Sequence, residues 1–410
     1  MGPIALFDKS FLQSISADES VWFDHFFMPI VCPVFYVETL GDLAKAPGRR
    51  GPPEVIVRDI ANKFPEWAGS PCVFHSQIAI NDLLGNRVEL QFQIPRPGGR
   101  PVKSGTVFEQ TPEEEAFHRW HNGQFHEVER LAAAHWRKAL SELDLVAVGK
   151  EMRALGFTPS ACGSLEEAKA IAEKLVNGAD RPYSRLALAA QFFDIPGHLH
   201  PQITEAWQRS GKRSLSEFAP YAAYALTVEL FFQIALGAGL IGGERPSNRT
   251  DIAYLFYLPF AMVFVSSDDL HRRTAPLFMR PDQTFAWGID LKQALRAVND
   301  HFLQLPEDER EKGISSFAHA PPPGNLAADL WDRFMRKGYR DERPARMERD
   351  EDEAELVRRL KAFAKQPTLS AAEMTAGEEA EMISISRMVR KKRGSWWQMP
   401  KDFKEQPEAD

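Results

Sequence analysis

One stretch limits the possible folds of this chain more than any other. It is Arg249–His271, with the sequence RTDIAYLFYLPFAMVFVSSDDLH. Asp251 follows a Pro-Ser-Asn turn and is expected to open a short apolar helix. The run Ala261–Val265 predicts a buried strand, because β-branched and aromatic residues suit a pleat that is covered on both faces. Asp268 and Asp269 follow this strand, at the edge where open α/β sheets bind ligands, so these acids either cap helices or hold a cation.

The N-terminal residues repeat this arrangement. Ile4–Phe7 predicts an apolar strand that ends in Asp8. The segment Cys32–Leu40 predicts a helix, since Pro33 suits its first position, and Glu38 follows within the same helix. One carboxylate among apolar neighbours is costly unless it is paired or bound to a metal.

Together these features resemble the PIN-domain nucleases. They are a strand ending in Asp, a P-x-x-x-x-E helix, an Asp at the start of a later helix, and a strand followed by S-S-D. In that family four acids from distant parts of the chain meet at the C-terminal edge of a parallel sheet, bind Mg²⁺ or Mn²⁺, and cut RNA phosphodiesters. The resemblance implies that the four catalytic and metal-binding acids are Asp8, Glu38, Asp251 and Asp268.

In the resulting hypothesis Asp8, Glu38 and Asp268 ligate the metal directly or through water. Asp251 holds a second ion or orients the attacking water, and Asp269 is a substitute or helper ligand. The neighbouring residues expected to contact the substrate phosphate are Lys9, Ser10 and Ser267. The competing interpretation is that these acids only cap helices and turns.

The chain departs from a compact PIN domain in its 410-residue length and in Tyr254, Phe256 and Tyr257, which stand where the family has small residues. We therefore expect a PIN-like α/β core, a parallel sheet flanked by helices, over residues 1–48 and 216–305. Residues 49–215 are expected to form a large, mostly helical insertion, and 306–410 a charged C-terminal extension of helices and loops.

Periodicity and capping signals predict further elements outside these motifs. The expected helices are Asp18–Phe27, Glu54–Phe64, a long helix capped by Thr111, Ser164–Val176, Arg185–Phe193, Asp290–Phe302 and Asn325–Met335. Pro276–Met279 is expected to be a strand, and Asp341–Asp352 a solvated mixed-charge helix or linker.

Composition indicates a globular protein of a reducing compartment. Hydrophobic residues make up 44% of the chain, enough for a sizeable core. The three cysteines, Cys32, Cys72 and Cys162, are scattered, which argues against a disulfide framework. No basic segment precedes the first apolar run, so a signal peptide is not expected and the cytoplasm is the expected location.

The run Tyr221–Ile241 has the length of a membrane span, which needs about 20 apolar residues. Glu229 and Gln233 near its centre favour a buried core helix instead, ended by Gly242-Gly243. A membrane-associated protein built on this run is the third and weakest functional hypothesis.

The tail Arg387–Phe403 combines cations with aromatic rings, and the net charge of -7 means that nucleic acid must bind through a local patch of this kind. Its residues of interest are Arg390, Lys391, Lys392, Arg393, Trp396 and Trp397. Cations beside stacking rings suit single-stranded nucleic acid. The other interpretation is an arm whose tryptophans dock into the same protein.

Besides the membrane-associated protein, two hypotheses about function remain open. The first is an Mg²⁺- or Mn²⁺-dependent endoribonuclease acting on single-stranded or structured RNA. The second is a catalytically inactive PIN-like protein that binds RNA or a protein, and a protein partner or a homo-oligomer fits either hypothesis.

Overall fold

The computed structural model describes residues 2–48, 51–103, 105–178, 182–336, 338, 340, 358, 362–369 and 382–403. Its centre is a five-stranded sheet with the order β3-β2-β1-β6-β7, in which every pairing is parallel. The strands are β1 (Ile4–Phe7), β2 (Met28–Val31), β3 (Ser70–Pro71), β6 (Val263–Ser266) and β7 (Thr284–Trp287). The chain runs outward from β1 in both directions, so the sheet order reverses between β1 and β6.

Helices cover both faces of this sheet. After β1 come α1 (Lys9–Ser14) and α2 (Ala17–Phe26), and after β2 come α3 (Pro33–Leu40), the 3-10 turn η1 (Gly41–Ala44) and α4 (Pro53–Lys63). The second half supplies α14 (Ser247–Ala253), the 3-10 segment η3 (Tyr254–Phe260), α15 (Asp269–Phe278) and α16 (Gly288–Phe302). α2 packs against α16, and α15 packs with η3 on β6 and β7. The expected α/β class with a parallel sheet flanked by helices is thus confirmed.

Several boundaries differ from the sequence predictions. The predicted strand Pro276–Met279 is wrong, because these residues mostly form the last turn of α15, where Phe278 is buried despite Pro276. Asp251 does not open a helix but lies in the second turn of α14. The long helix capped by Thr111 is interrupted at Gly123, whose φ of 72° lies in the left-handed region.

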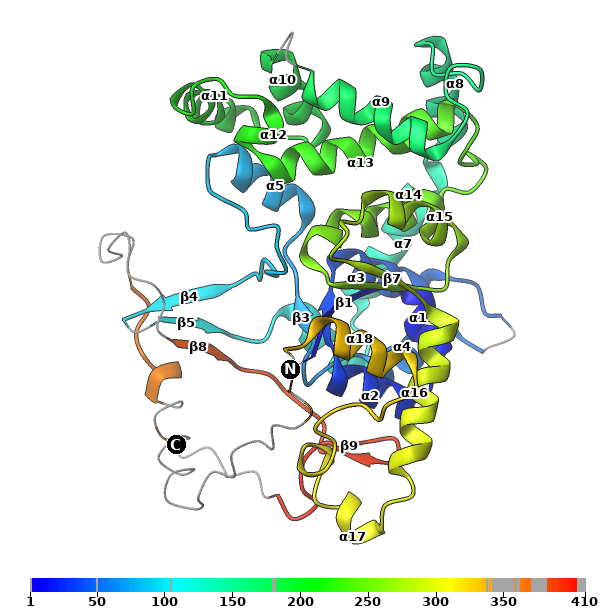
Figure 1. Cartoon of the computed structure of the whole chain (residues 1–410), viewed down its shortest axis with the longest axis vertical. Helices are drawn as coiled ribbons and strands as arrows, with labels where there is room; N and C mark the ends of the chain where they lie inside the picture. Colours follow the sequence, from blue (N-terminus) through cyan, green and yellow to red (C-terminus); the bar gives the residue numbers. More distant parts are fainter. Residues whose placement is uncertain are drawn as a thin grey trace.

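The insertion forms a helical layer at one end of the molecule (Figure 1). The helices of this layer are α5 (His75–Leu83), α8 (Leu145–Ala154), α9 (Leu165–Asn177), α10 (Pro182–Phe192), η2 (Gly197–Leu199), α11 (His200–Arg209), α12 (Leu215–Phe218) and α13 (Pro220–Gly237). The last of them lies in the range 216–305 that the sequence assigned to the core. Two other helices of the insertion pack on the core instead, α6 (Pro112–His121) on α4 and α7 (Glu127–Glu142) on η1 and α3. Because β3 joins the central sheet, the core extends into the range 49–215 that the sequence assigned to the insertion.

Helix α13 is the buried helix predicted from Tyr221–Ile241, although it ends at Gly237 rather than before Gly242-Gly243. It packs mainly on α8 and α9, and Glu229 forms an ion pair with Arg249. Among the described residues no helix has the length and apolar character needed to cross a bilayer.

A second, three-stranded sheet projects from the side of the molecule (Figure 1). It consists of β4 (Gly99–Val102), β5 (Gly105–Phe108) and β8 (Met382–Ile385), with β8 pairing parallel to β5. The C-terminal part also contains α17 (Glu307–Arg310), the 3-10 turn η4 (Ile314–Ser316), α18 (Leu326–Phe334), β9 (Lys392–Arg393) and β10 (Trp396–Trp397). The predicted mixed-charge run Asp341–Asp352 lies outside the described residues.

Candidate functional site

Asp8 is the first residue beyond the carboxyl end of β1, and it caps α1. Its Oδ1 accepts the backbone N–H of Phe11 at 2.9 Å. Its Oδ2 accepts the hydroxyls of Ser10 and Ser266, each at 2.7 Å. The side chain is buried, so these donors compensate the loss of hydration. Asp8 is therefore fixed in orientation by three protein donors.

A buried histidine, His271, joins the first and third predicted acids. Its Nδ1 lies 3.3 Å from Oδ2 of Asp8, and its Nε2 lies 2.6 Å from the backbone carbonyl oxygen of Asp251. Burial lowers the pKa of His271, but the hydrogen bond and charge of Asp8, with the charge of Asp251, outweigh it and raise that pKa to about 9. His271 is accordingly a buried imidazolium at neutral pH.

Lys9 forms the second cation of the site. Its Nζ lies 3.0 Å from Oε1 of Glu38 and 3.2 Å from Oδ1 of Asp42. Burial lowers the pKa of Lys9, but the two carboxylates outweigh it and the net direction is upward. Oε2 of Glu38 accepts the hydroxyl of Tyr254 at 2.8 Å. Protein carboxylates thus already pair with the ammonium group of Lys9, which the sequence suggested as a contact for the substrate phosphate.

Asp251 differs from these acids, because its carboxylate has no hydrogen-bond or ion-pair partner among the described residues. Burial raises the pKa of Asp251, His271 opposes the rise, and the charges of Asp268, Glu38 and Asp8 add to it, giving about 7. The charges of three other acids act on Asp251, so the four predicted acids lie near the same edge of the sheet. No protein group compensates the Asp251 carboxylate there.

The residues after β6 complete the edge. Asp268 caps α15, with Oδ1 accepting the backbone N–H of Leu270 at 2.7 Å. The backbone N–H of Ser267 donates to Oγ of Ser10 at 3.2 Å, while the Oγ of Ser267 is buried without a partner. Asp269 is exposed at the first position of α15, with no side-chain partner in the described part of the chain.

We call Asp8, Glu38, Asp251 and Asp268, together with the cations Lys9 and His271, the acid edge. It lies at the carboxyl ends of β1 and β6, where the sheet order reverses and where open α/β sheets bind ligands. No group of three or more His, Cys, Asp or Glu within the described residues is arranged to hold a metal ion.

Sequence reasoning missed three residues of this site. His271 was visible as the residue one helical turn after Asp268, which puts both side chains on the same face of a helix. Asp42 stands one turn after Glu38 in the same way, and so can hold the same cation. Nothing in the sequence pairs Tyr254 with Glu38, because this contact joins residues 216 positions apart.

A cavity of about 480 Å³ opens beside the acid edge, lined by Lys9 and Glu38. Helix α7 of the insertion forms its opposite wall with Trp136 and Arg137, and Arg245 lies at the start of the turn before α14. The guanidinium groups of both arginines have no ion-pair partner in the part of the chain that the structure describes. The insertion therefore lies over the acid edge and brings cations to it.

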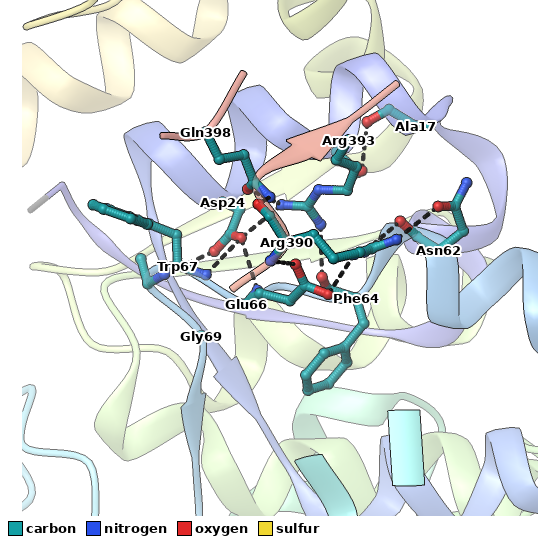
Figure 2. A network of polar contacts seen from close by, with 12 residues as sticks. Ala17, Asp24, Asn62, Phe64, Glu66, Trp67, Gly69, Arg390, Arg393 and Gln398 are labelled. Carbon is teal, nitrogen blue, oxygen red and sulfur yellow. Dashed lines mark hydrogen bonds and ion pairs between the residues drawn. The ribbon is translucent and has the colours of Figure 1, made fainter. Parts of the chain in front are cut away.

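The C-terminal arm, residues 387–403, packs against the core rather than standing free (Figure 2). Arg393 is 1% exposed and Trp396 is 0% exposed. The guanidinium of Arg393 lies 2.7 Å from Oδ2 of Asp24 and donates to the backbone oxygen of Phe64. Nε1 of Trp396 donates to Oδ1 of Asn299 at 2.8 Å.

The other basic residues of the arm divide between buried and exposed positions. Arg390 lies 2.6 Å from Oε1 of Glu66 and donates to Asn62, also drawn in Figure 2. Lys391, Lys392 and Trp397 are partly or fully exposed, and both lysines lie over the Trp397 ring. The burial and contacts of Arg393 and Trp396 agree with the second interpretation of the tail, an arm whose tryptophans dock into the same protein.

Comparison with models of protein families, with curated proteins and with solved structures gives no match. The resemblance to PIN-domain nucleases therefore rests on the residues of this chain and on their arrangement alone.

Proposed function

We propose that the protein is a PIN-like endoribonuclease that hydrolyses RNA phosphodiester bonds with Mg²⁺ or Mn²⁺ at the acid edge. One observation carries the proposal. The carboxylate of Asp251 is half-buried, has no partner among the described residues and is repelled by three further acids beside the point where the sheet order reverses. Proteins retain such an uncompensated charge mainly where a ligand balances it.

The donor atoms are of the type that a hard cation takes, although no three of the acids are arranged as a metal site within the described residues. Carboxylate oxygens are the ligands that Mg²⁺ and Mn²⁺ prefer, and Mg²⁺ typically uses one or two carboxylates, several waters and substrate phosphates. Asp251 offers both oxygens and Asp268 offers Oδ2, while Asp8 and Glu38 already accept hydrogen bonds from the protein. Asp251 and Asp268 would therefore hold the ion, with Asp8 and Glu38 contacting its water shell.

A bound divalent ion would supply an acidified water and charge neutralisation at phosphorus. The chain's own groups position the rest. The exposed guanidinium of Arg245 is suited to a phosphate oxygen. His271 holds Asp8 and the backbone of Asp251 in fixed orientation.

The test is cleavage of a mixed single-stranded and structured RNA pool by the purified protein, with Mn²⁺ or Mg²⁺ and with EDTA. Asp251→Asn should lower the cleavage rate by at least about 100-fold, as loss of a charge-stabilising group does. Asp308→Asn, which changes an exposed acid of α17, is the matched control and should keep full activity. Metal-independent cutting, or an unchanged Asp251→Asn rate, would refute the proposal.

The second candidate function is a catalytically inactive PIN-like protein that binds RNA or a protein. It is favoured by the protein donors that already occupy Asp8 and Glu38, since these acids need no metal to be stable. The two candidates separate in a melting experiment. A rise of the melting temperature with Mn²⁺ that Asp251→Asn abolishes supports the nuclease, and its absence together with no cleavage supports the binding protein.

A further inference from the structure

Three cavities follow one another around α3 from the acid edge outward. The first, of about 480 Å³, is the one beside Glu38. The second, of about 330 Å³, shares Trp136, Leu140 and Thr250 with it. The third, of about 470 Å³, shares Pro33 and Phe74 with the second. Because neighbouring cavities share wall residues, they lie side by side in a row that leads from the acids across α3, and we call this row the groove.

The groove carries aromatic rings along its length. Trp136 stands between the first and second cavities, Phe74 between the second and third, and Tyr36 lines the third. Phe74 is 44% exposed, an unusual position for a phenylalanine that has only a packing role. Each cavity has the size of a site for one small ligand, about 300–1,000 Å³.

Trp136 is held in place by the fold. Its ring lies against the backbone of Gly41, where a Cβ would approach the ring to 2.4 Å, so only glycine fits there. The rest of the half-buried ring lines both cavities. A rigid ring with one supported side is the arrangement on which a base stacks at low entropic cost.

Cations accompany the rings at the end of the groove nearest the acids. Arg137 and Arg245 line the first cavity and have no ion-pair partner among the described residues. Lys45 lies there too, and its side chain is 42% exposed although it contacts Asp42. Free guanidinium groups are suited to phosphate oxygens, so this end of the groove favours a phosphodiester backbone.

We propose that this groove binds single-stranded RNA, with bases stacked on Trp136 and Phe74 and the backbone phosphate held by Arg137 and Arg245 beside the acid edge. This inference rests on the proposed nuclease function and names its substrate class. Rings in a groove can stack only on unpaired bases, because a duplex keeps its base faces covered by neighbouring pairs. The rings therefore add no stacking contribution to the binding of a duplex.

Binding is measured separately from cleavage, by anisotropy of a short fluorescein-labelled RNA in EDTA with the full-length protein. Trp136→Ala should weaken binding of the single strand roughly 5- to 100-fold, the loss expected for one stacked base. Phe74→Ala should weaken it by a smaller factor, and Trp136→Phe should retain much of the affinity. Trp67→Ala, which removes a tryptophan that is 40% exposed outside the groove, should leave affinity unchanged.

The same RNA annealed to its complement should bind at least about tenfold more weakly than the single strand, because the stacking contribution is absent. Equal affinity for both forms, no binding by the wild-type protein, or an unchanged affinity of a folded Trp136→Ala would overturn the inference. Circular dichroism melting establishes that each variant is folded, and Phe74→Ala, whose affinity for the single strand should also fall, carries the test if Trp136→Ala is not folded.

Failure of the two proposals can be told apart. Metal-dependent cleavage with unaltered binding by Trp136→Ala refutes the groove and leaves the nuclease. Selective binding of the single strand that depends on Trp136, without cleavage by the wild-type protein in Mn²⁺, refutes the nuclease and leaves the groove.

Discussion

The acid edge and the network that anchors the arm both combine carboxylates with buried cations, yet they are balanced differently. In the arm network Asp24 accepts the backbone N–H groups of Glu66, Trp67 and Ala68 as well as Arg393. At the acid edge the carboxylates outnumber Lys9 and His271, and Asp251 accepts nothing. In the arm network each carboxylate is thus matched by donors, whereas at the acid edge one carboxylate is left without a partner among the described residues.

The largest expected effect is on the arm. Arg393→Met should lower the free energy of unfolding by about 3–5 kcal/mol, because it leaves the Asp24 carboxylate buried without its cation. Urea unfolding measures the change. Lys392→Ala, on the same strand but exposed, is the control and should change stability by less than about 0.5 kcal/mol. A loss below about 1 kcal/mol would mean that the three backbone donors suffice for Asp24.

The opposite sign is expected at the acid edge. Asp251→Asn should raise the free energy of unfolding by about 1–2 kcal/mol without metal, because it removes an unpaired charge that three acids repel. The same urea experiment in EDTA gives the value. Destabilisation would show that the carboxylate has a structural partner, and the contrast between the two networks would then be lost.

A pH-dependent effect is expected at His75, which stacks on Phe256 with ring centroids 4.1 Å apart. Burial, helped by the charge of Arg249, lowers the pKa of His75 to about 4. Below the unfolded value of about 6.5 the unfolded chain takes up a proton that the folded one does not. Stability from this group is thus full above pH 6.5 and is lost as pH falls toward 4.

Between pH 7 and pH 5 this linkage should cost about 1–2 kcal/mol, given 1.36 kcal/mol per pKa unit. His75→Phe keeps the stacked ring and should remove that part of the decline. Urea unfolding at the two pH values measures it. An identical decline in the variant would assign the pH dependence to other groups.

The smallest effect is expected at the exposed margin of the arm. Lys401 contacts Glu311 at 2.6 Å, but the lysine side chain is 54% exposed. Lys401→Ala should leave the free energy of unfolding nearly unchanged, and any loss should fall further in high salt, because solvent and ions screen such pairs. A loss as large as that of Arg393→Met would show that exposure does not separate strong from weak pairs in this arm.

The sequence was most informative where an apolar run met an acid. Ile4–Phe7 and Pro33–Leu40 were predicted closely, because the strand ends in a polar residue and the helix begins with proline. Strands β2 and β3 escaped prediction, since each is short and contains a proline, which central strands ordinarily exclude. Pairing with neighbours on the sheet decides these segments, and local sequence does not record it.

The sequence predicted the acids of the candidate site, but not the cations and hydrogen-bond donors that pair with them. The four carboxylates lie where strands and helices place them. Lys9 pairs with Glu38 and Asp42, and Arg393 is buried against Asp24. Both contacts depend on side chains brought together from distant parts of the chain. A basic cluster in a sequence therefore does not reveal whether its charges face solvent or the interior.

The parallel pairing of β1 with β6 has a consequence for synthesis on the ribosome. Asp8 and Ser266, which hydrogen-bond across this pairing, are 258 residues apart. At a synthesis rate of about 5–20 residues per second, β6 leaves the ribosome on the order of tens of seconds after β1. During that time the backbone N–H and C=O groups along one edge of β1 have no strand to pair with. This edge is thus open to pairing with other chains until the second half of the core is translated.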